Sequence, residues 1–270
     1  MRIFAIKNEE DKKTLAYLLY YEKEKAFYIE LPENADPWET PLILSSFAKK
    51  NITTVNSYWS RMWVQQRIVP SDRQNLGQVL KENKLSEYDE FELLMLSHGR
   101  CAQDELYLEE IEEKDIPKDI IKRFDKKIED IVPLKNFNLL VFFRNGTIKK
   151  CNIKKFFEKN KALETFLTVN IDMFEYVQVQ SGGYGIRWEE NMSISDEELY
   201  ASGRTIPLSS DDFREFVVHR VINSAEAAEL LDCSRQNIKD LIRRNKLHPI
   251  KSTEKNTLFL KSEVMKRNWQ

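Results

Sequence analysis

The chain has 270 residues, of which 41% are hydrophobic, 32% charged and 11% aromatic. This is the composition of a globular protein with material for more than one core, and the length alone predicts about two domains. Seven glycines are too few for glycine-rich phosphate-binding architectures. No run approaches the ~18–20 apolar residues of a membrane helix, and the N-terminus turns charged after six residues, so we expect neither a membrane span nor a secretory signal.

The three cysteines are Cys101, Cys151 and Cys233, at least 50 residues apart. An odd number with no Cys-x-x-Cys spacing predicts neither a disulfide framework nor a cysteine zinc site. We therefore expect a cytoplasmic protein.

The net charge of −2 hides an uneven distribution. Residues 221–270 carry ten Lys and Arg against six Asp and Glu, whereas the other 220 residues are net acidic. A compact basic tail on an acidic body indicates a module that faces nucleic acid, attached to a body that faces something else.

The first segment, expected to be an α+β domain over 1–133 that docks a partner, mixes strand and helix patterns. Ser57 is expected to cap a helix, Gly99 to end one, and Pro133 to close the segment. The expected strands are 2–7, 14–21, 26–31 and 106–111, the middle two forming a hairpin, and the expected helices are 57–68, 72–83, 87–97 and 118–127.

The second segment, 134–206, is expected to be a small β-β-α-β-β-α domain. Its clearest hairpin joins 139–143 to 147–153 through Asn145-Gly146, a pair that suits a tight turn with two positive φ angles. A helix over about 153–167 follows, then a second hairpin of 176–180 and 185–189. Ser195 and Glu198 form a capping box that opens a short helix, and 206–212 is expected to be a linker.

The third segment, 219–270, is predicted to be a winged helix-turn-helix. Ser224, Ser234 and Ser262 are expected to cap helices over 225–231, 235–245 and 263–269. Between the last two, strands 247–251 and 257–260 enclose a polar wing. The fold class is therefore α+β and multidomain.

The second helix of this segment carries the strongest functional signal. Arg, Gln and Asn side chains in its first turn suit bidentate contacts to guanine and adenine, and the basic residues around them suit phosphates. We expect double-stranded DNA as the partner. The candidate DNA-binding residues are Ser234, Arg235, Gln236, Asn237, Lys239, Arg243, Arg244, Lys251, Lys255 and Lys261.

Two sequence stretches carry the resemblance of this segment to a known family. SAEAAELLDCSRQNIKDLIRRNKLHPIK and TLFLKSEVMKRNW resemble the winged helix-turn-helix of the excisionase/MerR type. One departure concerns the first turn, where Asp232 or Cys233 replaces the usual glycine. The resemblance implies a DNA-binding module.

Two further resemblances concern the body of the chain. LLVFFRNGTIKKCNIKKFF, FEYVQVQ and GYGIRWEENMSISDEELY resemble a bacterial domain family of unknown function, number 2442, whose members often occur beside toxin–antitoxin partners or a helix-turn-helix. The hairpin LAYLLYYEKEKAFYIEL and the stretch EFELLMLSHGRCAQD resemble the N-terminal subdomain of HipA-type toxin kinases, without the kinase domain. The second resemblance implies scaffolding or docking.

Signals for catalysis are poor. The glycine cluster 181–185 precedes a strand instead of a helix, so a hairpin turn is the favoured interpretation. His98 and Cys101 straddle a helix end and are interpreted as structural. The three histidines lie in different segments, so we expect no metal site, no cofactor and no enzymatic activity.

The sequence favours a sequence-specific DNA-binding transcriptional regulator, antitoxin-like, whose body binds a protein partner or a second copy. The alternative is an antitoxin or adaptor that binds a partner protein without binding DNA.

Overall fold

The computed structural model describes residues 1–189, 192–265 and 267. The chain divides into two compact units, one made of 1–145 and 151–203 and the other of 146–150 and 204–270. Both units mix helices with small, mainly antiparallel sheets, so the expected α+β multidomain class is confirmed. No helix in the described part of the chain is long and apolar enough to cross a membrane.

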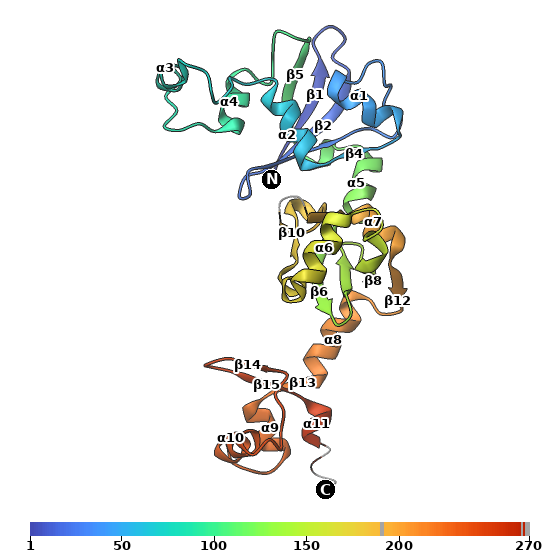
Figure 1. The fold of residues 1–270 in the computed structure, drawn as a ribbon, viewed down its shortest axis with the longest axis vertical. Helices are drawn as coiled ribbons and strands as arrows, with labels where there is room; N and C mark the ends of the chain where they lie inside the picture. Colours follow the sequence, from blue (N-terminus) through green and yellow to red (C-terminus); the bar gives the residue numbers. More distant parts are fainter. Residues whose placement is uncertain (190–191, 266, 268–270) are drawn as a thin grey trace. The chain divides into compact units, whose positions relative to one another are not determined.

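The first unit opens with a five-stranded antiparallel sheet of order β4-β3-β2-β1-β5 (Figure 1). Its strands β1 and β2 are buried on both faces, which explains their nearly continuous apolar sequences. Phe4 and Ile6 belong to one core cluster, whereas Ile3 and Ala5 belong to another on the opposite face. The strands are β1 (Arg2–Asn8), β2 (Thr14–Tyr21), β3 (Ala26–Glu30), β4 (Thr54–Val55) and β5 (Leu106–Ile111).

Helices cover both faces of this sheet. Leu44 and Trp63 pack into the larger cluster, and Ile120 into the smaller one. Helix α3 has no buried residue and projects from the sheet (Figure 1). The helices are α1 (Leu42–Lys49), α2 (Ser57–Gln65), α3 (Leu76–Glu82), α4 (Glu90–Leu96) and α5 (Lys118–Phe124).

Several expectations for this segment need correction. Helix α1 and strand β4 were not expected from the sequence. The cap of α2 is Asn56 instead of Ser57, because the Asn56 amide oxygen accepts the Trp59 N–H. Pro133 does not close a domain, since it lies inside β6 and opposite Leu139 of β7.

The remainder of the first unit has its own core. Strands β6 and β7 pair antiparallel, and β10 lies between β9 and β11. The elements are β6 (Ile128–Leu134), β7 (Asn138–Phe143), α6 (Lys161–Val169), β9 (Gln178–Val179), β10 (Gly185–Glu189), β11 (Met192–Ser195) and α7 (Asp196–Ser202), with 3-10 helices at Ile153–Phe156, Ile171–Tyr176 and Ser181–Gly183. Strand β8 (Ile148–Asn152) begins in the segment assigned to the second unit and ends in the first.

The second hairpin, β9 with β10, and the capping box of Ser195 and Glu198 are confirmed. The single helix expected over 153–167 is wrong, because Asn160 takes a non-helical conformation with a φ of −132° and a ψ of 83° and caps a new helix by accepting the Leu163 N–H. The turn at Asn145-Gly146 also differs, since only Gly146 has a positive φ. The Asn145 N–H instead donates to the Asp125 carbonyl.

The second unit ends in a helix-turn-helix with a three-stranded sheet of order β13-β15-β14 (Figure 1). The expected linker 206–212 runs into a helix, α8, which Ser209 opens with a capping box. The elements are β12 (Arg204–Ile206), α8 (Ser210–Arg220), β13 (Val221–Asn223), α9 (Ser224–Leu230), α10 (Arg235–Arg243), β14 (Lys251–Ser252), β15 (Thr257–Leu260) and α11 (Lys261–Met265).

Two of the three expected caps in this unit are wrong. Asn223 caps α9 in place of Ser224, because its side chain accepts the N–H groups of Ala225 and Glu226. Ser262 lies inside α11, which begins one residue earlier. Of the final helix expected over 263–269, residues 266, 268 and 269 lie outside the described residues.

Candidate nucleic-acid interface

The geometry of α10 follows from its sequence. Ser234 has an extended backbone and its hydroxyl accepts the Asn237 N–H at 3.2 Å, which satisfies one of the donors at the helix start. Ile238 is fully buried, and Leu241 and Ile242 pack partly against the same core. The opposite side of the helix is therefore fixed toward solvent.

The turn between α9 and α10 tolerates the absent glycine. Asp232 takes the left-handed conformation with a φ of 46°, which Asp adopts more readily than most residues. The Cys233 N–H then donates to the Ala228 carbonyl at 2.9 Å, a bond typical of a helix C-terminus. Half-buried Cys233 packs against the core, so the turn retains the geometry that a glycine would provide.

The exposed side of α10 carries the polar side chains expected to read bases. Arg235, Gln236, Asn237 and Lys239 are all exposed. They come from the first half of the helix, where the recognition helix of a helix-turn-helix meets base edges. Ser234 is exposed as well, but its oxygen already serves as the cap.

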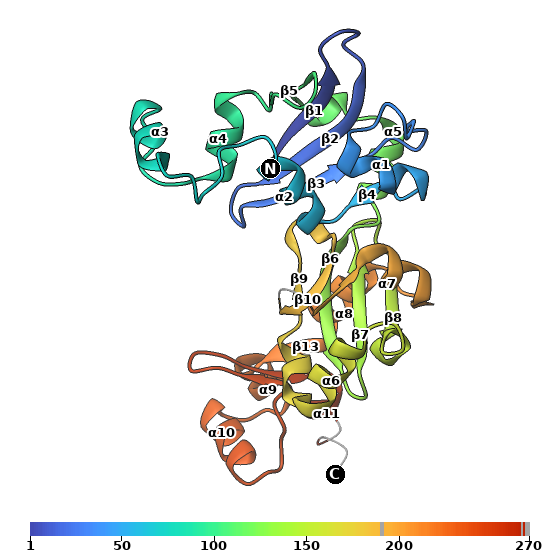
Figure 2. The ribbon, with the colours of Figure 1, turned by 45° about the horizontal axis from the view of Figure 1, so that its top comes forward.

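The expected phosphate contacts lie at the helix end and on the wing. Arg243 is the last residue of α10 and pairs with Asp240 at 2.9 Å, while Arg244 is the C-cap. Lys251 lies on β14 and Lys255 in the wing turn, both exposed. In Figures 1 and 2 the β14–β15 hairpin and α10 extend to the same side of this unit.

Lys261 occupies a different position from the other nine. It is the first residue of α11, directly after β15, and it is half-buried instead of standing on the wing. Within the wing itself, the Thr253 N–H donates to the Asn256 carbonyl at 2.8 Å, and this bond closes the turn that presents Lys255.

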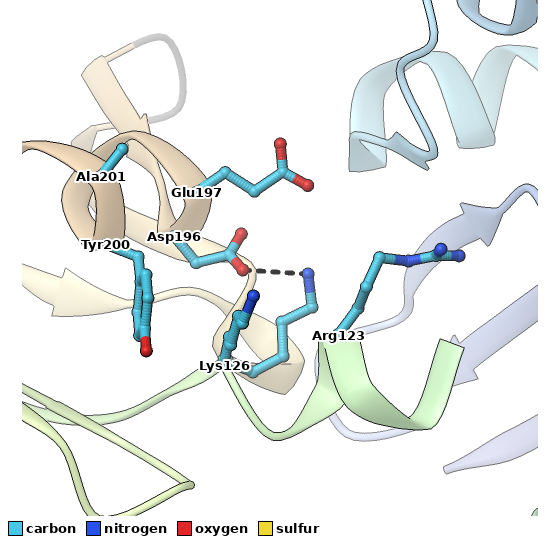
Figure 3. Close-up of a pocket in the computed structure, with 7 residues that line it drawn as sticks. Arg123, Lys126, Asp196, Glu197, Tyr200 and Ala201 are labelled. Carbon is cyan, nitrogen blue, oxygen red and sulfur yellow. Dashed lines mark hydrogen bonds and ion pairs between the residues drawn. The ribbon is translucent and has the colours of Figure 1, made fainter. Parts of the chain in front are cut away.

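A second polar site, in the first unit, was not foreseen from the sequence. A cavity of about 270 Å³ is lined by charged side chains from α5, from the segment after it and from α7 (Figure 3). Among its lining residues, Lys127 is only 1% exposed and donates to Asp196 Oδ2 at 3.0 Å. Burial is the main cause that raises the pKa of Asp196 to about 6, and Lys127 partly opposes it.

The same lysine links two further buried groups. Glu30 is fully buried, with Oε1 3.9 Å from the Lys127 ammonium and Oε2 3.0 Å from Arg123 Nε. The Tyr184 ring centroid lies 3.9 Å from the same ammonium, and burial raises the pKa of the Tyr184 hydroxyl well above its ordinary value. This cluster ties strand β3 to the start of β6 and to α7, a structural role.

The groups considered for catalysis lie apart from this cluster. Cys101 Sγ lies 3.4 Å from Arg67, whose guanidinium pairs with Asp104 and donates to the Gly99 carbonyl. His98 and Gly99 both have positive φ angles and end α4. Among the described residues no group of three or more His, Cys, Asp or Glu side chains is arranged to hold a metal ion.

Comparisons with known proteins matched two segments. Residues 128–205 match the family described as "Protein of unknown function (DUF2442)", and residues 221–267 match the family described as "Helix-turn-helix domain". No curated protein and no solved structure matched the chain. The HipA-type resemblance of the first segment is matched by neither family and stays a prediction.

Both matches begin at the first residue of a strand. The middle match begins at residue 128, the first residue of β6, and therefore earlier than the expected 134. The C-terminal match begins with β13. The resemblances of the middle and C-terminal segments are confirmed: the chain carries a DUF2442-type domain followed by an excisionase-type helix-turn-helix, a DNA-binding module.

Proposed function

We propose that this protein is a sequence-specific regulator of transcription whose C-terminal helix-turn-helix binds duplex DNA. The observation that carries the proposal is the two-sided character of α10. Its apolar side is fixed in a core by Ile238, and its first turn presents Arg235, Gln236 and Asn237 to solvent. An α-helix with polar side chains at its start fits the major groove.

The proposed contacts divide into reading and positioning. Gln236 and Asn237 suit adenine, and Arg235 suits guanine, because each can form two hydrogen bonds with one base edge. Arg243, Arg244, Lys251 and Lys255 suit phosphates, which fix the position on the duplex without reading its sequence. The ten basic residues of this tail, against six acidic ones, favour such contacts.

The body of the chain is proposed to bind a protein and to catalyse nothing. Trp38 is 87% exposed and Tyr58 64% exposed, and exposed Trp and Tyr side chains are the residues that dominate protein interfaces. An antitoxin-like role, in which the body holds a partner while the tail holds DNA, fits this arrangement. The place of action is then the compartment of the genome, which in a bacterium is the cytoplasm.

The same aromatic side chains favour the second candidate function, an antitoxin or adaptor that binds its partner without DNA. The salt dependence of binding separates the two. A tail that contacts several phosphates loses affinity steeply as salt rises, because each neutralised phosphate releases counterions. A tail that docks on protein need not show this.

The test is selection of genomic fragments by the purified full-length protein, followed by affinity measurements on a selected fragment and on random DNA at several salt concentrations. The proposal predicts a recurring motif and a preference of at least about 10³-fold for it. Enrichment of no motif, with equal affinity for all duplexes, would contradict sequence-specific regulation.

A further inference from the structure

Helix α8 is unusual among the longer helices of the described chain because none of its residues is buried. Phe216 is 50% exposed and Val217 53% exposed. An isolated helix of about this length is marginal in water, and most helical stability comes from packing of an apolar face. Helix α8 therefore has an exposed apolar surface, and a partner that covered this surface would stabilise the helix.

The exposed side chains lie on identifiable sides of the helix. At about 100° per residue, Phe216 and Val217 are neighbours, and Arg220 lies one turn beyond Phe216 on the same side. Val218, which is 65% exposed, points to the other side. One side of α8 thus has an apolar centre at Phe216 and Val217. On the other side, Val218 is a similarly exposed apolar residue that can serve as a control position.

The charges of α8 are ordered along its axis. Asp211 and Asp212 lie in the first turn, and His219 and Arg220 in the last. Some of these groups already have local partners: Asp211 pairs with Arg214 at 3.1 Å. When two copies of this helix lie antiparallel, the acidic end of each meets the basic end of the other, whereas a parallel pair would set like charges together.

We propose that the side of α8 around Phe216 and Val217 is a self-association surface, on which α8 of a second copy packs antiparallel. This inference rests on the proposed function, because a helix-turn-helix commonly reads two half-sites about 34 Å apart as a two-fold dimer. An antiparallel pair of identical helices has the required two-fold symmetry.

The size of the surface sets the strength of the association. Eleven residues form a helix of about 16 Å, and two such helices bury less than the ~1,200 Å² of a standard stable interface. The dimer is therefore weak in free solution and forms on DNA, where two neighbouring half-sites bring the copies together. Its signature is cooperative binding.

The test compares full-length wild type with the double variant Phe216→Gln/Val217→Gln and with Val218→Gln as the matched control. All three substitutions replace exposed apolar side chains by a good helix former. Each protein is titrated onto duplexes that carry one or two copies of the selected half-site. Sedimentation of the free proteins over a concentration series gives their masses.

Wild type and Val218→Gln are expected to bind the second half-site about tenfold more tightly than the first, a coupling within the usual range. The double variant is expected to lose this gain and to keep the affinity for a single half-site. Independent binding by wild type, or equal loss in Val218→Gln, overturns the proposal.

Two outcomes separate this inference from the proposed function. Wild type that binds no DNA overturns the regulator, and the surface is then judged by sedimentation alone: self-association at high concentration that only the double variant lacks supports it. The second outcome adds amide hydrogen exchange of α8. If wild type sediments as a monomer at every concentration while the α8 amides exchange slowly, another part of the same chain covers the apolar side of α8. That result overturns the dimer.

Discussion

The ammonium of Lys127 lies 3.0 Å from Oδ2 of Asp196, and both side chains are buried although 69 residues separate them. Asp196 is the first residue of α7, and Lys127 directly precedes β6. Glu30 approaches the same lysine from β3. Lys127 therefore faces two buried carboxylates from distant parts of the first unit, and one of them, Glu30, also pairs with Arg123.

Lys127→Ala should destabilise the protein by about 3–5 kcal/mol, because it leaves Asp196 buried without its cationic partner and Glu30 with Arg123 alone. Urea denaturation measures the free energy of unfolding. The neighbouring Lys126 is exposed, so Lys126→Ala is the control and should change stability by no more than about 0.5 kcal/mol. If the two variants lower the free energy of unfolding equally, Lys127 does not compensate the buried carboxylates.

The pH dependence of stability should reveal Asp196. Its pKa is raised from 3.8 to about 6 in the folded protein, mainly by burial, so the folded state binds the proton more tightly than the unfolded state. Its contribution is therefore fully present below about pH 4 and is lost as pH rises through about 6. Relative to Asp196→Asn, wild type should gain stability as pH falls from 7 to 4. A difference that is flat or opposite in sign contradicts this.

The first unit should fold without the tail. Its core clusters lie within residues 3–199, and the cluster of the helix-turn-helix lies within 222–264, so no core cluster of the described residues crosses α8. A fragment of residues 1–208 keeps β12 and ends before the cap Ser209. It should unfold cooperatively and bind no DNA. An insoluble fragment beside well-behaved full-length protein would show that the tail completes a core.

Cys101→Ser and His98→Ala should leave DNA binding and any biological readout unchanged. Cys101 packs beside Arg67 and Asp104, and His98 ends a helix at a φ of 50°, so each substitution should cost only modest stability. Thermal unfolding and DNA titration measure the two properties separately. Loss of a biological readout in a folded variant would restore the catalytic interpretation.

Strong local patterns were predicted correctly from the sequence. The strands β2 and β5 match their expected residues: β2 is a nearly continuous run of apolar and aromatic residues, and β5 begins with the apolar and aromatic Leu-Tyr-Leu. The capping box at Ser195 and the cap at Ser234 are also as expected, since each rests on a side chain three residues from its partner. The apolar side of α10 follows from the spacing of Ile238, Leu241 and Ile242.

Features that depend on tertiary contacts were missed. Nothing in the local sequence distinguishes buried Lys127 from exposed Lys126, because the burial comes from Glu30 and Asp196, far away in the chain. The sequence predicts Ser57 and Ser224 as caps, one residue after the actual caps Asn56 and Asn223, since both residue types suit the position. The sequence does not predict helix α8, because Val218 lies on the opposite side from Phe216 and Val217 and weakens the apolar periodicity.

The most direct test of the DNA-reading helix compares Gln236→Ala with Arg243→Ala. Gln236 lies in the first turn of α10 and Arg243 at its end, and both are exposed, so neither variant should unfold the domain. Affinities are measured on a selected site and on random DNA, across a range of salt concentrations.

Gln236→Ala should lose about 1–3 kcal/mol on the selected site and little on random DNA, because it removes a base contact. Arg243→Ala should lose similar affinity on both and reduce the salt slope by about 1, because it removes a phosphate contact. If the two variants instead weaken both duplexes alike, with the same change in salt slope, α10 does not read the major groove.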